Sequence, residues 1–324
     1  MTDTGADMMM CCASCGIAEV DNTKLRTCTA CKSVRYCSVE CQKEHRPQHK
    51  RACKKRAAEL HDEILFKQPE SSNKGDCPIC FLPLSLDVKK SKIYSCCSKL
   101  ICNGCGYAAQ VREDEERLKH KCPFCRQPVP DTGEEMVSYV MKRVEANDPL
   151  ALITMAVKCR DKGDHGSAFE YLTKAAGLGH ADAHYQLSVM YDDGIFVEKD
   201  IRKALYHKEE AAIGGHAYAR YNLACEEWNS GRTKRGVKHW IIAANLGCDD
   251  SIEALKKTYS KGLVRKEDFA AALRAHQAAV DATKSPQRDD VEAFLWDQIQ
   301  QNIKFNRTRV NQSLPPARCD ENSS

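Results

Sequence analysis

The sequence predicts small cysteine-rich modules at its N-terminal end, followed by an all-α solenoid of helical hairpin repeats. Two observations predict this division. Sixteen of the 20 cysteines lie between Cys11 and Cys125, and the other four are spread over the rest of the 324 residues. In the second half, adjacent alanines recur at a spacing of 32 to 36 residues, which is typical of stacked helical hairpins; these are Ala175-Ala176, Ala211-Ala212, Ala243-Ala244 and Ala278-Ala279.

The central cysteine-rich stretch holds eight cysteines in four pairs. Three pairs have the form Cys-x-x-Cys, and the fourth is the adjacent pair; they are Cys77 and Cys80, Cys96 and Cys97, Cys102 and Cys105, and Cys122 and Cys125. A Cys-x-x-Cys turn brings two thiolates close enough to share a tetrahedral zinc ion. A single pair is also typical of redox sites, whereas four pairs within 49 residues indicate metal binding. Eight ligands would form two closed zinc sites.

With these pairs and the ending Cys122-Pro-Phe-Cys125-Arg126, the stretch resembles a RING-type zinc finger. The resemblance implies a cross-brace, in which the first and third pairs hold one zinc and the second and fourth pairs hold the other. The family usually has a histidine three residues before the third pair, where this sequence has Lys99. We therefore expect both Cys96 and Cys97 to bind the second zinc. Since adjacent cysteines form a cramped chelate, His120 remains an alternative ligand.

A second set of eight candidate ligands precedes this stretch: Cys12, Cys15, Cys28, Cys31, Cys37, Cys41, His49 and Cys53. The run Tyr36-Cys37-Ser38-x-x-Cys41-Gln42, followed by His49-x-x-x-Cys53, resembles a MYND-type zinc finger. The resemblance implies one zinc on Cys12, Cys15, Cys37 and Cys41 and another on Cys28, Cys31, His49 and Cys53. The family binds short proline-containing peptides. Together the two stretches predict four Zn²⁺ ions.

The run Leu187-Ser188-x-x-Tyr191-x-x-Gly194, followed by Asp200-x-x-Lys203-Ala204, resembles a Sel-one-like repeat, a relative of the tetratricopeptide repeat. Seven residues before each alanine pair stands a small residue, and we predict that these line a stripe where helices approach closely; they are Ala168, Ala204, Gly236 and Ala271. The apolar residues Val291, Phe294, Leu295 and Ile299 predict a further amphipathic helix. We interpret it as a cap on the solenoid, with a partner-binding helix as the alternative.

The predicted boundaries are a disordered start at 1–10, the MYND-type finger at 11–56, a helical linker at 57–75, the RING-type finger at 76–130, a linker helix at 131–148, the repeats at 149–285, a C-terminal helix at 286–306 and a disordered tail at 307–324. Clustered cysteines indicate a reducing compartment, so we expect a cytoplasmic or nuclear protein. Fifteen zinc-bound thiolates and four Zn²⁺ would change the formal charge of +4 to about −3. Charge therefore gives no support for nucleic-acid binding, and no apolar run suggests a membrane segment.

The RING-type resemblance implies a ubiquitin ligase that has no nucleophile and no catalytic residue of its own. Such a finger would dock a ubiquitin-conjugating enzyme through apolar contacts from Ile79 and Pro123. Arg126 would hydrogen-bond both the enzyme and its ubiquitin, and the MYND-type finger and the repeats would recruit the substrate. Ala109 stands where active members often have a bulky apolar residue. The alternative is therefore a non-catalytic, zinc-dependent adaptor for protein–protein interaction.

Overall fold

The computed structural model of the chain describes residues 11–19 and 24–295. The predictions for 1–10, 307–324 and the end of the C-terminal helix lie outside these residues. The chain forms two compact units, residues 1–68 and 69–324. Within the described residues, no helix is both long enough and apolar enough to cross a membrane.

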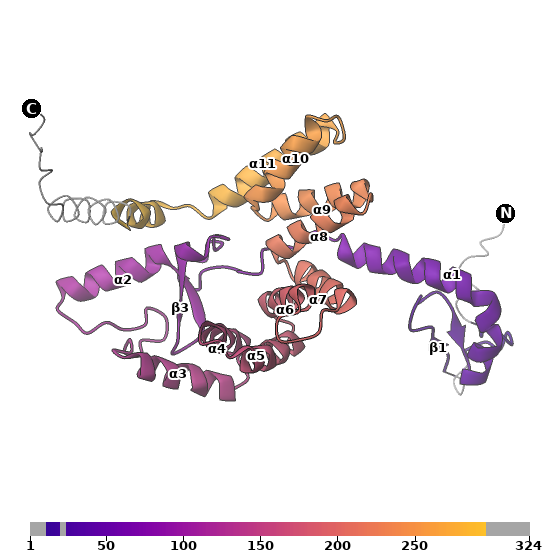
Figure 1. Cartoon of the computed structure of the whole chain (residues 1–324), viewed down its shortest axis with the longest axis horizontal. Helices are drawn as coiled ribbons and strands as arrows, with labels where there is room; N and C mark the ends of the chain where they lie inside the picture. Colours follow the sequence, from indigo (N-terminus) through magenta and orange to yellow (C-terminus); the bar gives the residue numbers. More distant parts are fainter. Residues whose placement is uncertain (1–10, 20–23, 296–324) are drawn as a thin grey trace, which may run out of the picture. The chain divides into compact units, whose positions relative to one another are not determined.

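The first unit is a small cysteine-rich fold with one long helix (Figure 1). Strands β1 (Arg26–Thr27) and β2 (Arg35–Tyr36) pair antiparallel, and α1 (Val39–Leu65) follows them. Helix α1 begins at this point because the Ser38 hydroxyl accepts a hydrogen bond from the Cys41 N–H. The predicted boundary between the finger and a helical linker lies at residue 56, but α1 crosses this boundary without a break.

The second unit opens with a short hairpin and a helix. Strands β3 (Ser91–Tyr94) and β4 (Lys99–Cys102) pair antiparallel after the 3₁₀ turn η2 (Val88–Lys90), and α2 (Asn103–Glu115) follows. The alternating acidic and basic side chains of residues 107–119 predict a short exposed helix there. Helix α2 starts and ends four residues earlier, because the Cys102 thiol caps it by accepting a hydrogen bond from the Cys105 N–H. The third cysteine pair is therefore the first turn of α2.

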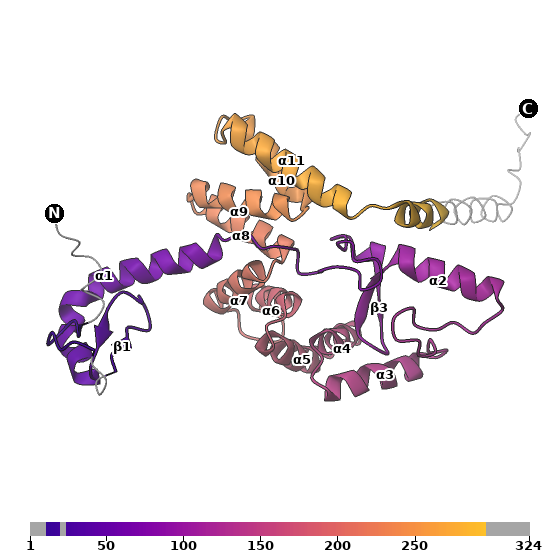
Figure 2. The same cartoon turned by 180° about the vertical axis from the view of Figure 1, so that it is seen from behind.

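From residue 133 to 295, the last described residue, the second unit is all-α, as the fold class predicted. Its helices are α3 (Gly133–Glu145), α4 (Pro149–Asp161), α5 (His165–Gly177), α6 (Ala181–Asp193), α7 (Ile201–Ile213), α8 (Ala217–Asn229), α9 (Thr233–Asn245), α10 (Asp249–Tyr259) and α11 (Lys266–Ala282). The linker helix is present as α3, and Asp148 caps α4 with Pro149 in its first turn. Consecutive helices pair as antiparallel hairpins that stack in chain order (Figures 1 and 2).

The predicted stripe of small residues is correct in three hairpins and wrong in the last. Ala168, Ala204 and Gly236 are buried, and each is the fourth residue of its helix. Ala271 is exposed, whereas its neighbour Ala272 is buried. The reason is that α11 starts five residues before Ala271 rather than three, so the alanine pair in this helix no longer marks the same face.

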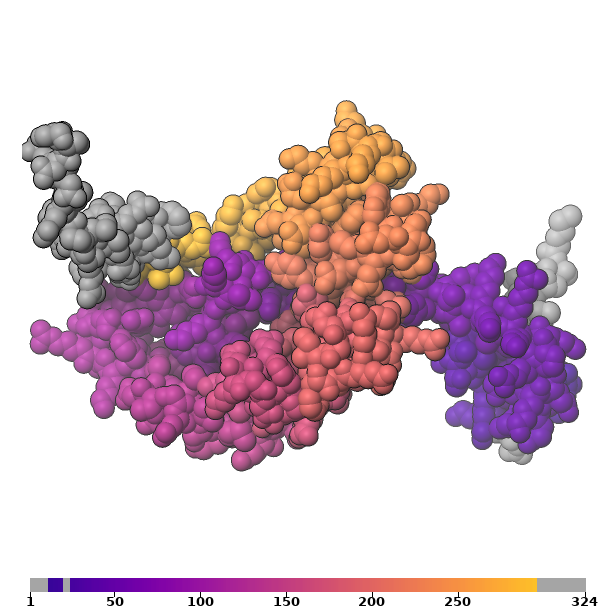
Figure 3. Space-filling model, viewed as in Figure 1, coloured from indigo at the N-terminus to yellow at the C-terminus, as the bar shows by residue number. Residues whose placement is uncertain are grey.

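Residues 286–295 are helical, but they do not cap the solenoid as we had interpreted them. The helix starts where Ser285 accepts a hydrogen bond from the Arg288 N–H and Pro286 occupies the first turn. Its side chains contact the cysteine-rich module instead: Phe294 stacks near Tyr107 of α2, with ring centroids 5.0 Å apart. In Figure 3 the yellow residues accordingly meet the magenta surface of that module.

Candidate zinc centres and a tryptophan pocket

The first unit contains two clusters of four ligand atoms, each with all four atoms within 4.8 Å of one another. Their members are Cys12, Cys15, Cys37 and Cys41, and Cys28, Cys31, His49 and Cys53. The Sγ atoms of Cys28 and Cys53 lie 3.8 Å apart, and Cys31 Sγ lies 3.3 Å from His49 Nε2. A zinc ion with Zn–S bonds of about 2.3 Å spaces its thiolates by roughly 3.8 Å along each tetrahedral edge. The clusters therefore fit zinc, whereas a disulfide would need about 2.05 Å.

Helix α1 contributes ligands to both clusters of the first unit. Cys41 lies in its first turn, and His49 and Cys53 follow on one face because they are four residues apart. A supporting group that was not predicted from the sequence lies next to His49. The ring of His45 stacks on that of His49 at 5.5 Å, and its Nδ1 lies 3.1 Å from the buried Tyr36 hydroxyl. This contact orients the α1 face that carries the ligands. In the sequence, only the i, i+4 spacing of the two histidines indicated that they contact each other.

The second unit holds two further clusters, each made of cysteines alone. The structure brings together Cys77, Cys80, Cys102 and Cys105 in one, and Cys96, Cys97, Cys122 and Cys125 in the other. Sγ distances across the pairs are 3.8 Å for Cys80 and Cys102 and 3.7 Å for Cys97 and Cys122. The first pair meets the third and the second meets the fourth, so the clusters interleave along the chain.

Both adjacent cysteines reach the second cluster of this unit because they lie in the turn between β3 and β4. The N–H groups of Cys97 and Ser98 both donate to the Tyr94 carbonyl, and Ser98 has a positive φ of 52°. This tight turn points two consecutive side chains toward one centre. His120 lies elsewhere: its ring nitrogens are 3.5 Å from the Glu113 carboxylate and 3.4 Å from that of Asp114.

The carboxylate of Glu113 connects α2 to the last zinc loop. The side chain is buried, and it accepts a hydrogen bond from the Lys121 N–H, the residue before Cys122. The alternating charges of this helix predict that it is exposed, whereas Glu113 is buried. The Glu113 carboxylate thus has a structural role, and only the tertiary fold distinguishes it from the other charged side chains of the helix.

The thiols within a cluster do not ionise independently. Burial raises the pKa of Cys28, but hydrogen bonds from the Cys31 backbone and from His49 outweigh it and lower the pKa to about 6. In the same cluster, burial and the hydrogen bond with Cys28 raise the pKa of Cys53 to about 11. The negative charge of one thiolate therefore disfavours ionisation of the neighbouring thiol. All of the thiols lose their protons together only when a cation is bound. These donor sets of sulfur and imidazole suit zinc.

The predicted partner-binding residues lie on the zinc loops of the second unit. Ile79 and Pro123 are half-buried, while Arg126 is exposed and has a positive φ of 64°. Two exposed aromatic residues beside them were not among the predicted contacts. Phe81 is 75 % exposed and Phe124 is 44 % exposed, so the two loops present more apolar area than the predicted residues alone. In the sequence, each of these phenylalanines is adjacent to a cysteine ligand, and this position could have identified them as candidate contacts.

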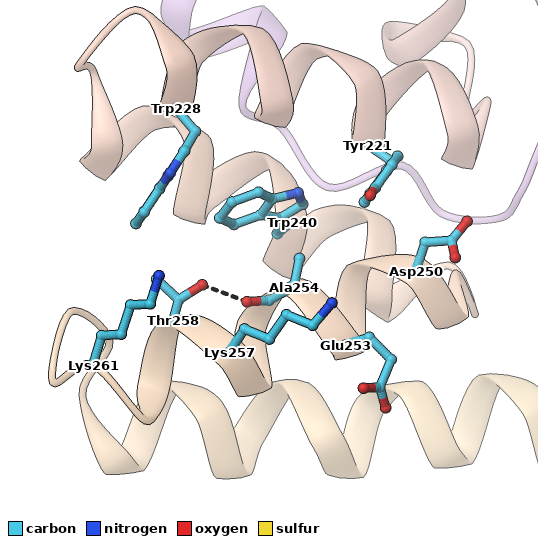
Figure 4. A pocket seen from close by; sticks show the side chains of 9 residues that line it. All are labelled: Tyr221, Trp228, Trp240, Asp250, Glu253, Ala254, Lys257, Thr258 and Lys261. Carbon is cyan, nitrogen blue, oxygen red and sulfur yellow. Dashed lines mark hydrogen bonds between the residues drawn. The ribbon is translucent and has the colours of Figure 1, made fainter.

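A separate pocket of about 310 Å³ lies between α8, α9 and α10 (Figure 4). The rings of Trp228 and Trp240 are 5.2 Å apart and form one wall, and Lys257 and Lys261 of the α10 side lie opposite. The Nε1 of Trp240 is buried without a hydrogen-bond partner among the described residues. The pocket is thus lined by aromatic faces, two ammonium groups and the carboxylates of Asp250 and Glu253.

Two parts of the chain match known protein families. Residues 12–53 match the family described as MYND finger, which is the segment that builds the first two clusters. This segment is a MYND finger. Residues 160–180 and 181–216 match the Sel1 repeat, and they span α5 to α7. Both kinds of module mediate protein–protein interaction, so the chain combines a zinc-binding MYND finger with an interacting helical array.

Solved structures resemble the chain at low identity. A Sel1 repeat protein from Oxalobacter formigenes is 23 % identical, with a TM-score of 0.40, over 55 % of this chain and 72 % of the other. A protective antigen of uropathogenic Escherichia coli with an SLR fold is 19 % identical, with a TM-score of 0.36, over 68 % and 43 % of the two chains. An immunity protein from Pseudomonas aeruginosa is 17 % identical, with a TM-score of 0.30, over 56 % and 84 %. The solenoid assignment rests on the helices and the Sel1 match. The RING-type finger stays a prediction.

Proposed function

We propose that the chain is a RING-type ubiquitin ligase, in which residues 77–126 dock a ubiquitin-conjugating enzyme. The observation that carries the proposal is the interleaving of two all-cysteine clusters, because a cross-brace of this kind holds two zinc loops side by side. Ile79 lies between the first two ligands and Pro123 between the last two, and Arg126 directly follows the last. The MYND finger and the Sel1 repeats recruit the protein to be modified.

The finger contributes binding and orientation rather than a reacting group. Ile79 and Pro123, with the exposed rings of Phe81 and Phe124, supply apolar area to the conjugating enzyme. Fully burying one such side chain stabilises a complex by about 1.5–3 kcal/mol. Arg126 is exposed, so its guanidinium is available to bridge the enzyme and ubiquitin and restrain the thioester for attack by a lysine.

A second function, that of a non-catalytic zinc-dependent adaptor, is favoured by Ala109. This residue lies on α2, four residues after Cys105, and it is half-buried. Its single methyl group offers little area to a conjugating enzyme. An adaptor would use the same modules as binding surfaces without ubiquitin transfer.

A discharge assay separates the two functions. A conjugating enzyme loaded with labelled ubiquitin is mixed with the full chain and free lysine, and loss of the thioester is followed over a panel of such enzymes. For a ligase, Ile79→Ala weakens enzyme binding, with a loss of about tenfold or more in affinity. Arg126→Ala leaves binding nearly unchanged and slows discharge.

The matched control is Arg274→Ala, since Arg274 is an exposed arginine on α11 and should affect neither step. Zinc content is measured for each variant, because neither Ile79 nor Arg126 belongs to a ligand cluster. A wild-type chain that accelerates discharge with none of the enzymes would refute the ligase and leave the adaptor.

A further inference from the structure

A buried arginine from the C-terminal helix reaches one of the all-cysteine clusters. Arg288 is 8 % exposed, although most arginines lie at protein surfaces. Its Nη2 donates a hydrogen bond of 3.2 Å to the Sγ of Cys80, 208 residues earlier in the chain. The same nitrogen donates to the Leu82 carbonyl at 3.1 Å, and Nη1 donates to the Pro83 carbonyl at 2.7 Å.

These bonds hold the whole first zinc loop rather than one atom. Cys80 is a cluster member, and Leu82 and Pro83 continue the loop beyond it. The guanidinium is a planar fork, so it can donate to sulfur and to two carbonyl oxygens at once, which an ammonium cannot do in this geometry. Nη1 also donates to the Thr283 carbonyl at 2.7 Å, which ties the fork to the C-cap of α11.

The rest of the helix face fits the same module. Val291, one turn after Arg288, is 3 % exposed. Glu292 forms an ion pair of 2.8 Å with Lys90, and Phe294 lies against Tyr107. The helix also passes very close to α2, since a Cβ on Gly104 would lie 3.0 Å from Arg288 Cγ. Arg288 is therefore positioned by a continuous packed face.

We propose that Arg288 is a positioning residue of the zinc site formed by Cys77, Cys80, Cys102 and Cys105. Four thiolates around Zn²⁺ leave two net negative charges, and a buried guanidinium offsets part of this charge. A donor to a zinc-bound sulfur fixes that ligand, and losing such a partner typically weakens metal binding by 10- to 100-fold. The C-terminal helix thus helps to retain the zinc. The zinc in turn fixes the loop on which this helix docks.

The test is zinc release from the full chain carrying Arg288→Met, a change that keeps the aliphatic volume and removes every donor. A chelator is added in excess, released zinc is followed by a colorimetric indicator, and newly accessible cysteines are identified by alkylation and mass spectrometry. We expect one zinc equivalent to leave about tenfold faster than in the wild type. Alkylation should rise at Cys77, Cys80, Cys102 and Cys105 and remain unchanged at Cys122 and Cys125.

Two further variants separate a role at sulfur from a role in packing. Phe294→Ala removes the ring contact with Tyr107 and keeps the guanidinium, so it should loosen the helix in hydrogen exchange with a smaller effect on zinc. Arg274→Met on α11 is the control for loss of an arginine and should match the wild type. The proposal is wrong if Arg288→Met releases zinc at the wild-type rate. It is also wrong if Phe294→Ala accelerates release as much as Arg288→Met does, or if all zinc equivalents leave faster together. None of these outcomes depends on ubiquitin transfer.

Discussion

At the scale of single residues, the solenoid contains a buried lysine that is paired with carboxylates from two other helices. Lys208 of α7 is 3 % exposed, and its ammonium lies between the carboxylates of Asp192 on α6 and Glu226 on α8. Burial lowers the pKa of this lysine, but the hydrogen bonds that its ammonium donates to both carboxylates outweigh burial and raise the pKa above its ordinary value. The lysine therefore stays charged and joins two neighbouring hairpins.

Replacing Lys208 by Met should destabilise the solenoid by about 2 kcal/mol, because two charged hydrogen bonds are lost and two carboxylates are left facing each other. Urea unfolding followed by tryptophan fluorescence measures this change, since all three tryptophans lie in the second half of the sequence. The control is Lys203→Met on the same helix, where the side chain is 60 % exposed and its contact with Asp200 is 3.9 Å. Its effect should stay within about 0.5 kcal/mol, and equal effects for the two lysines would contradict the prediction.

At the scale of elements, close approach between helices depends on single small residues. Gly236 lies inside α9, and a Cβ there would be 2.9 Å from the Ala224 carbonyl oxygen of α8 and 3.3 Å from the Trp228 nitrogen. Both neighbours are backbone atoms, so they cannot move aside as a flexible side chain would. The α8–α9 hairpin therefore needs glycine at this position for packing, although glycine weakens a helix.

Replacing two helical glycines by alanine should consequently change the free energy of unfolding in opposite directions. Gly236→Ala should lower the free energy of unfolding by about 1–3 kcal/mol through overpacking. Gly177→Ala, in α5, meets no atom within 4 Å, and it should raise stability by up to about 1 kcal/mol through helix propensity. The same urea titration measures both. Stabilisation by Gly236→Ala would show that the two helices separate more easily than the geometry implies.

At the scale of the whole molecule, the zinc modules and the solenoid are stabilised by different means. The cores of the modules consist largely of their own ligands, such as Cys12, Cys28 and Cys31 in the first unit. The solenoid instead has apolar clusters that contain no metal ligand, around residues such as Leu152 and Leu187 and around Trp240 and Leu255. Metal removal should therefore affect the two parts very differently.

Elemental analysis of protein purified without chelator should give four zinc ions per chain, one for each cluster. After chelation, hydrogen exchange should rise throughout residues 12–53 and 77–126, because these small modules owe most of their stability to metal. The helices from α4 to α10 should remain protected. Two zinc ions or fewer would contradict the assignment of the clusters, and loss of protection across the repeats would contradict their independent core.

The sequence by itself determined the features that depend on local spacing. The closeness of ligands that are neighbours in sequence follows from turns and from helix periodicity, as His49 and Cys53 on α1 illustrate. The Sel1 hairpins follow from the recurrence of alanine pairs, and the start of α4 from Asp148 and Pro149. In each of these cases the residues that decide the structure lie within a few positions of one another, or repeat at a fixed interval.

The tertiary structure alone decided where elements distant in sequence meet. The docking of residues 286–295 on the zinc loop joins Arg288 to Cys80 across 208 residues, and an amphipathic pattern identifies an apolar face without naming what covers it. The burial of Glu113 and the shift from Ala271 to Ala272 have the same origin. Periodicity fixes which residues share a face of one helix, but the start of that helix and the shape of its neighbour decide which face is buried.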